Sequence, residues 1–145
     1  MAEHGEVYTN EREVNAMLDL VQSECEKIDA TFLEPACGNG NFLVEILRRK
    51  LAVIREDTSQ EQWEDASVRA VKSIYGVDIL PDNIEESRER MYKIWEAEYT
   101  ARFGIACQRR VCEEVKEVLG QNIICGDFLT GVRNDGGEIV FHEWK

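Results

Sequence analysis

The sequence predicts an α/β fold, with an N-terminal helix followed by a partial, doubly wound and mostly parallel sheet. Three observations predict it. Short β-type segments alternate with longer segments of helical periodicity. A glycine turn joins the first strand to the next helix, and the first three strands end in Glu34, Asp78 and Asp127. The length of 145 residues suits one domain, so residues 1–145 are expected to form a single unit.

The N-terminal helix is predicted from apolar residues on one helical face between Val14 and Ile28, with Asn10 and Glu13 as a capping-box-like start. A strand is expected at 31–33, because Pro35 cannot occupy a central ladder position. The elements expected after it are helices at 42–51, 60–72, 81–103 and 108–119, strands at 73–80 and 122–125, and a last β segment at 138–144 after a turn at 134–137. Ligands of parallel sheets bind outside the carboxyl ends of the strands, so the three carboxylates are expected on one rim.

The composition restricts the classes of function. The chain carries 17 Lys and Arg against 29 Asp and Glu, which gives a net charge of −12. So acidic a chain is a poor nucleic-acid binder by itself, because phosphate contacts need clustered cations. No apolar run reaches the ~20 residues of a membrane span, and the first residues lack the basic and apolar regions of a secretion signal. A cytoplasmic location without membrane association is therefore expected.

The cysteines and histidines do not suggest a metal site. There are five cysteines and two histidines, with no C-x-x-C pair and no spacing of the zinc-ribbon kind. The expectation is reduced, mostly buried thiols and no bound metal.

The segment from Glu34 to Leu43, EPACGNGNFL, is the most informative part of the sequence. Glycines between a strand and a helix let a ligand approach the backbone, and the helix N-terminus offers N–H groups. A dinucleotide site requires a third glycine for close helix packing, where this chain has Leu43. The segment therefore argues against NAD as the cofactor that binds here.

This segment resembles motif I of the amino-methyltransferases of restriction–modification systems, which methylate N6 of adenine in DNA with S-adenosylmethionine. Three further segments resemble family elements in the family's order: residues 7–9 the N-terminal Y-T-P element, 74–79 motif II and 122–129 motif III. Asn10 replaces the proline of the first element. The resemblance implies a Rossmann-like class I methyltransferase fold, similar to the large methylases of type I and type IIG systems.

The resemblance also implies a role for each site residue. Glu34 would bind the methionine ammonium of S-adenosylmethionine, Asp78 the two ribose hydroxyls, and Asp127 the adenine amino group. Thr9 would contact the methionine carboxylate. The loop under the methionine and ribose would consist of Pro35, Ala36, Gly38, Asn39 and Gly40. Ile79 and Phe128 would make apolar contacts to the adenine.

Three of these residues have a structural alternative. Asp127 could cap a turn, Asp78 could cap the helix that begins at Pro81, and Thr9 could be an N-terminal turn residue. Cys37 has no nucleophilic partner nearby in the sequence and is predicted to serve in packing.

The family's catalytic motif, [DNS]-P-P-[YFW], has no counterpart in this chain, whose two prolines, Pro35 and Pro81, are far apart. No catalytic residue is therefore predicted. The expectation is the cofactor-binding part of an adenine-specific DNA methyltransferase, truncated before that motif and before the target recognition region. DNA binding would then come through segments missing from this chain, or through further methylase or specificity subunits. The alternatives are a non-catalytic cofactor-binding module complemented by another chain, and a small-molecule class I methyltransferase.

Overall fold

The computed structural model describes residues 10–144, so Thr9 lies outside the described residues. Asn10 caps the first helix as predicted, because its side-chain oxygen accepts a hydrogen bond of 2.9 Å from the Glu13 N–H. The elements in chain order are α1 (Glu11–Asp19), α2 (Gln22–Cys25), β1 (Phe32–Glu34), α3 (Asn41–Ala52), α4 (Gln60–Lys72), β2 (Ile74–Asp78), α5 (Pro81–Phe103), the 3₁₀ helix η2 (Gly104–Ala106), α6 (Arg109–Asn122), β3 (Ile123–Asp127) and β4 (Val132–Arg133).

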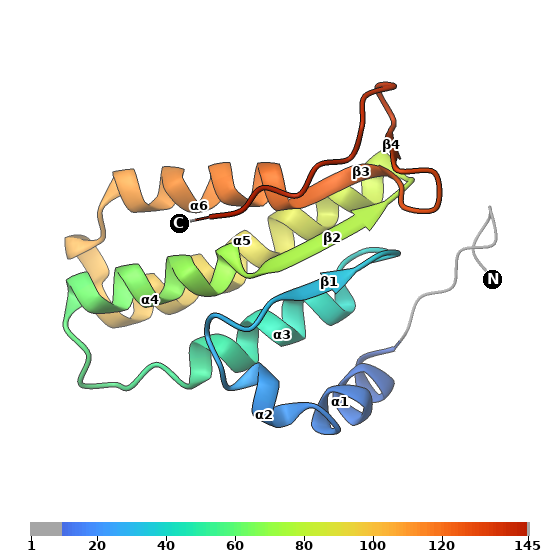
Figure 1. Cartoon of the computed structure of the whole chain (residues 1–145). Helices are drawn as coiled ribbons and strands as arrows, with labels where there is room; N and C mark the ends of the chain where they lie inside the picture. Colours follow the sequence, from blue (N-terminus) through green and yellow to red (C-terminus); the bar gives the residue numbers. More distant parts are fainter. Residues whose placement is uncertain (1–9, 145) are drawn as a thin grey trace.

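The strands form a mixed sheet in the order β1-β2-β3-β4 (Figure 1). β1 and β2 are parallel, with Glu34 opposite Gly76, and β2 and β3 are parallel, with Asp78 opposite Cys125. β4 joins the edge of β3 in the antiparallel direction. The prediction of an α/β fold with a mostly parallel sheet is confirmed.

Helices α3, α4, α5 and α6 all contact strands of the sheet, and the C-terminal segment packs against Tyr75 of β2. A Cβ atom on Gly76 would lie 2.8 Å from Leu43 Cδ1, so α3 lies very close to β2. On the opposite face, the Tyr75 hydroxyl donates a hydrogen bond of 2.6 Å to the His142 carbonyl, and the Phe141 ring packs edge-on against Tyr75.

The predicted double winding is not met within residues 10–144. The three parallel strands are consecutive neighbours, and right-handed crossovers between such neighbours place both connecting helices on the same face. Residues 139–144 run across the other face, where a second helical layer would lie in a doubly wound sheet (Figure 1).

Helices α4 and α6 lead directly into β2 and β3 and pack against each other and against α5 (Figure 1). The core between α4 and α5 is aromatic. The Trp63 and Tyr99 rings are stacked with centroids 5.4 Å apart, and the Trp95 centroid lies 4.9 Å from that of Tyr99. All three side chains are fully buried, so the second half of α5 is firmly anchored while its first half lies beside the glycine turn.

The predicted helix through Ile28 is wrong at its end. It is interrupted between α1 and α2 and stops at Cys25. The fully buried Lys50 ammonium donates hydrogen bonds of 2.7, 2.8 and 2.7 Å to the carbonyls of residues 27, 28 and 30. The carbonyls of residues 28 and 30 are therefore satisfied by a side chain from α3 instead of by helical N–H groups, and the Lys27 carbonyl also accepts from the Ala30 N–H at 3.2 Å.

The last strand also lies elsewhere than predicted. β4 precedes the turn at 134–137, and residues 139–144 form no strand. Gly126 explains the difference, because a Cβ atom at that position would lie 2.8 Å from the Val132 carbonyl oxygen. Only glycine lets β4 approach β3 so closely.

Candidate functional site

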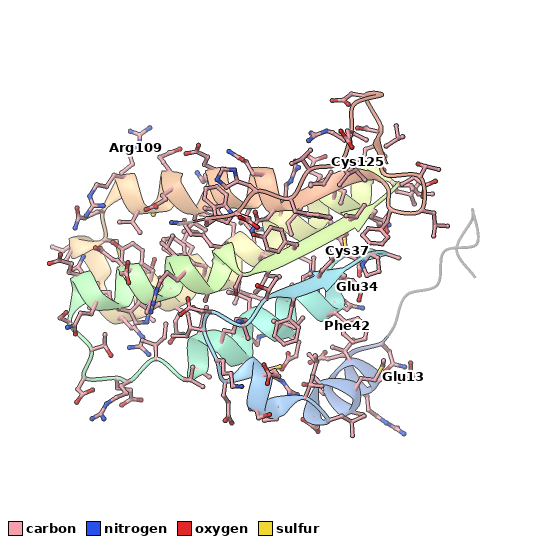
Figure 2. The ribbon with its side chains drawn as sticks, in the orientation of Figure 1. Glu13, Glu34, Cys37, Phe42, Arg109 and Cys125 are labelled. Carbon is pink, nitrogen blue, oxygen red and sulfur yellow. The ribbon has the colours of Figure 1, made fainter. Side chains whose placement is uncertain are left out.

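The predicted site lies at the carboxyl ends of β1, β2 and β3. Figure 2 shows Glu34 and Cys37 at the same end of the sheet as Cys125 of β3. Glu34 is level with Gly76, and Asp78 is level with Cys125, so each successive carboxylate lies two residues further along its strand. Side chains of a strand alternate between the two faces of the sheet. Glu34, Asp78 and Asp127 therefore all project from the same face, the one to which a Cβ atom on Gly76 would point, toward Leu43 of α3. The three carboxylates share one edge and one face, in a staggered row.

The glycine loop, residues 35–40, connects β1 to α3. Gly38 and Gly40 both have positive φ, of 55° and 96°, and Gly40 is the N-cap residue of α3. The Cys37 N–H donates to the Val77 carbonyl at 2.8 Å, which ties the loop to β2. Gly40 supplies no side-chain cap, so the first N–H groups of α3 are not covered by a cap side chain.

Asp78 supports the loop and the start of α5. Its Oδ2 accepts a hydrogen bond of 3.0 Å from the Gly38 N–H. Its Oδ1 accepts from the Leu80 N–H at 2.9 Å and from the Asn83 side-chain amide at 3.2 Å. Asp78 therefore has a structural role before α5 but does not cap the helix, whose N-cap residue is Leu80. A carboxylate has about four acceptor positions. Residues 10–144 occupy three of them, so within this part of the chain one position, on Oδ2, is left for a ligand hydroxyl.

Glu34 is half-buried and forms no ion pair with any residue of the described part of the chain. Its Oε1 accepts a hydrogen bond of 3.2 Å from the Ala36 N–H. Burial raises the pKa of Glu34, although the bond from Ala36 opposes the change. A buried carboxylate without a cationic partner is unfavourable, and a ligand ammonium would supply the missing charge.

Asp127 also has a structural role, because its Oδ1 accepts a hydrogen bond of 2.9 Å from the Leu129 N–H and so caps the turn after β3. Within residues 10–144, no hydrogen bond is made by Oδ2. Two exposed apolar side chains follow the strand ends, Ile79 after β2 and Phe128 after β3, with exposed fractions of 54% and 41%. They are available to an apolar ligand ring.

The other predicted loop residues differ in exposure. Pro35 and Ala36 are exposed, and Asn39 is half-buried. Cys37 is buried, and a Cβ atom on Gly76 would lie 3.3 Å from the Cys37 sulfur, so the predicted packing role is confirmed. Burial and the nearby Asp78 carboxylate raise the pKa of Cys37 to about 12.

Sequence reasoning missed residues that build the loop from outside it. Gly76 allows α3 to lie close to β2, the task assigned to a third glycine in the dinucleotide fingerprint. Three side chains of α5 face the loop and Asp78, and we call them the polar stripe: Asn83, Ser87 and Arg90. Their spacing of i, i+4 and i+7 marks one helical face and was the available signal.

Residues 10–144 contain no group of three or more His, Cys, Asp or Glu side chains that could hold a metal ion. All five cysteines are free thiols. Among the helices described, none combines the length and apolarity needed to cross a membrane. Comparison with family models, with curated proteins and with solved structures finds no match.

Proposed function

We propose that this chain is the S-adenosylmethionine-binding part of a DNA methyltransferase that acts on N6 of adenine. The observation that carries the proposal is the half-buried Glu34 carboxylate, which lacks an ion-pair partner among residues 10–144 at the start of a glycine loop. The resemblance of four sequence segments to the amino-methyltransferases supports the same conclusion.

The donors and acceptors on the rim fit this cofactor. Glu34 would bind the ammonium of its methionine part, an opposite-charge pair that charge-assisted hydrogen bonds strengthen. Asp78 would accept one ribose hydroxyl with the remaining position on Oδ2, one fewer than the family resemblance implies. Asp127 Oδ2 would accept from the adenine amino group, with Ile79 and Phe128 beside the ring.

The cofactor supplies a methyl group that is already activated by its sulfonium. The task of this chain is to bind and orient it at the rim. The groups that would hold the adenine amine, an acceptor followed by two prolines and an aromatic residue, are not in the sequence. With a net charge of −12, the chain is also unsuited to holding DNA by itself.

Titration calorimetry of the purified chain with S-adenosylhomocysteine and, separately, with NAD tests the proposal. We expect saturable binding of the first and none of the second. Glu34→Gln should weaken the binding, whereas Glu61→Gln, which changes an exposed glutamate of α4, should not. A folded wild-type chain that binds neither ligand, or that prefers NAD, would overturn the proposal.

A further inference from the structure

The polar stripe of α5 fixes the carbonyl groups of the glycine loop. The Ser87 hydroxyl donates a hydrogen bond of 3.2 Å to the Gly38 carbonyl. Arg90 Nη1 donates to the Asn39 carbonyl and to the Asn41 side-chain oxygen, at 2.9 Å in both cases. Two consecutive carbonyls of the loop are therefore held toward α5.

Packing makes this arrangement specific. A Cβ atom on Gly40 would lie 2.9 Å from Ser87 Oγ and 3.2 Å from Ser87 Cα. The loop thus packs against both the side chain and the backbone of Ser87 in α5. Ser87 is fully buried and Arg90 is half-buried, so both are part of the fold beneath the loop.

Arg90 has no acidic partner in the described part of the chain. Arg90 forms no ion pair with any residue between 10 and 144, in a chain with 29 acidic residues. Its guanidinium contacts Asn41, the first residue of α3. The positive end of the helix and the guanidinium therefore add, and together they favour an anionic group at this place.

A carboxylate and a guanidinium, neither with an ion-pair partner among residues 10–144, thus lie at the two ends of the glycine loop. Glu34 precedes the loop, and Arg90 holds its last residues. A free amino acid group carries an ammonium and a carboxylate, so its two charges match this pair in sign.

We propose that Arg90 is a positioning residue that orients the glycine loop and selects a ligand with a free carboxylate beside its ammonium. The inference rests on the proposed function, because the amino acid group in question is that of S-adenosylmethionine. It adds Arg90 of α5 to the recognition of the carboxylate, for which the family resemblance implies only Thr9.

The test compares S-adenosylmethionine with decarboxylated S-adenosylmethionine, which keeps the ammonium and the adenosine. Calorimetry is run on the wild type, Arg90→Ala, Arg90→Lys and Arg88→Ala. Arg88 is the matched control, because it is on the same helix but donates to the Gly120 and Ile123 carbonyls, away from the loop. Amide hydrogen exchange of residues 36–44 is measured without ligand on all four proteins.

We expect Arg90→Ala to weaken S-adenosylmethionine about tenfold or more, the lower end for loss of a hydrogen bond to a charged group. It should weaken decarboxylated S-adenosylmethionine by a smaller factor, because that ligand is affected only by the loss of loop orientation. Arg90→Lys should recover part of the loss, and residues 36–44 should exchange faster in Arg90→Ala than in Arg88→Ala. Unchanged affinity in Arg90→Ala, or an equal loss for both ligands, would refute the inference while leaving the proposed function intact.

If the wild type binds neither ligand, the proposed function fails, and the exchange measurement decides separately whether Arg90 orients the loop. Faster exchange in Arg90→Ala alone supports that part. Equal exchange in the two alanine variants refutes it.

Discussion

Two features of the structure require glycine at position 40, a positive φ and a close contact with α5. The free-energy cost of violating each can be measured separately. Its φ of 96° is in the left-handed region, which costs a residue with a side chain about 1–2 kcal/mol. A Cβ atom would also lie 2.9 Å from Ser87 Oγ, and overpacking of this kind costs about 1–3 kcal/mol. Gly40→Ala is therefore expected to lower the free energy of unfolding by about 2–5 kcal/mol.

Gly136 and Gly76 provide matched controls. Gly136 has nearly the same φ, 92°, but a Cβ atom added there would meet no other atom within 4 Å, so Gly136→Ala should show the conformational cost alone. Gly76 has ordinary φ but would contact Leu43 at 2.8 Å and Cys37 at 3.2 Å, so Gly76→Ala should show the packing cost alone.

Urea unfolding followed by circular dichroism measures all three variants against the wild type. The double variant Gly40→Ala/Ser87→Ala removes the closest contact, the Ser87 hydroxyl, and should recover part of the loss. A cost for Gly40→Ala no larger than that for Gly136→Ala would contradict the argument, since the contact with α5 would then have no energetic weight.

Three further predictions concern the rim and the reaction. Asp78→Ala should weaken S-adenosylhomocysteine by about 1.5–3 kcal/mol, the range for a hydrogen bond to a charged group, and wild-type affinity in calorimetry would remove Asp78 from the site. Because its pKa is raised to about 12, Cys37 should react with iodoacetamide more slowly than Cys125 at pH 8 and faster as the pH rises, as followed by mass spectrometry; equal rates would contradict its burial. Residues 1–145 alone should transfer no tritiated methyl group to unmethylated DNA, because no acceptor–proline–proline–aromatic segment is present to hold the amine. Incorporation abolished by Asp127→Ala would show that prediction to be wrong.

Local signals in the sequence were sufficient for most of the elements but not for contacts between distant residues. The Asn10 cap, the glycine turn and Pro81 at the start of α5 each depend on neighbours within a few residues, and the structure confirms them. The early end of α2 depends on Lys50, more than twenty residues away in the chain, and no periodicity contains that information.

The site shows the same division. The three strand-end carboxylates were predicted because each follows a recognisable strand, and the register confirms their common edge. The support of the loop by Ser87 and Arg90 depends on how α5 lies across the loop. Their helical spacing was visible in the sequence, but nothing in it indicated which face of α5 would meet the loop.

The carboxylates of the rim differ in whether they stabilise the fold or are expected to bind the ligand, and Glu34 gives the sharpest prediction. Burial raises the pKa of Glu34 in the folded chain above its value in the unfolded chain. The unfolded chain therefore releases this proton at lower pH, so the stability of the wild type falls as the pH rises through the range from 4.5 to the raised value.

The substitution Glu34→Gln removes this pH-dependent loss of stability, since glutamine does not ionise. Above this range the variant should be at least as stable as the wild type, although it binds S-adenosylhomocysteine more weakly. Urea unfolding at pH 4 and pH 7, with Glu61→Gln as the exposed control, measures the difference. A Glu34→Gln variant that is less stable than the wild type at pH 7 would show that the carboxylate serves folding, as Asp78 does through Gly38 and Leu80. A variant with higher stability and lower affinity would identify Glu34 as a charge kept at a cost in stability, which is the pattern expected of a ligand-binding residue.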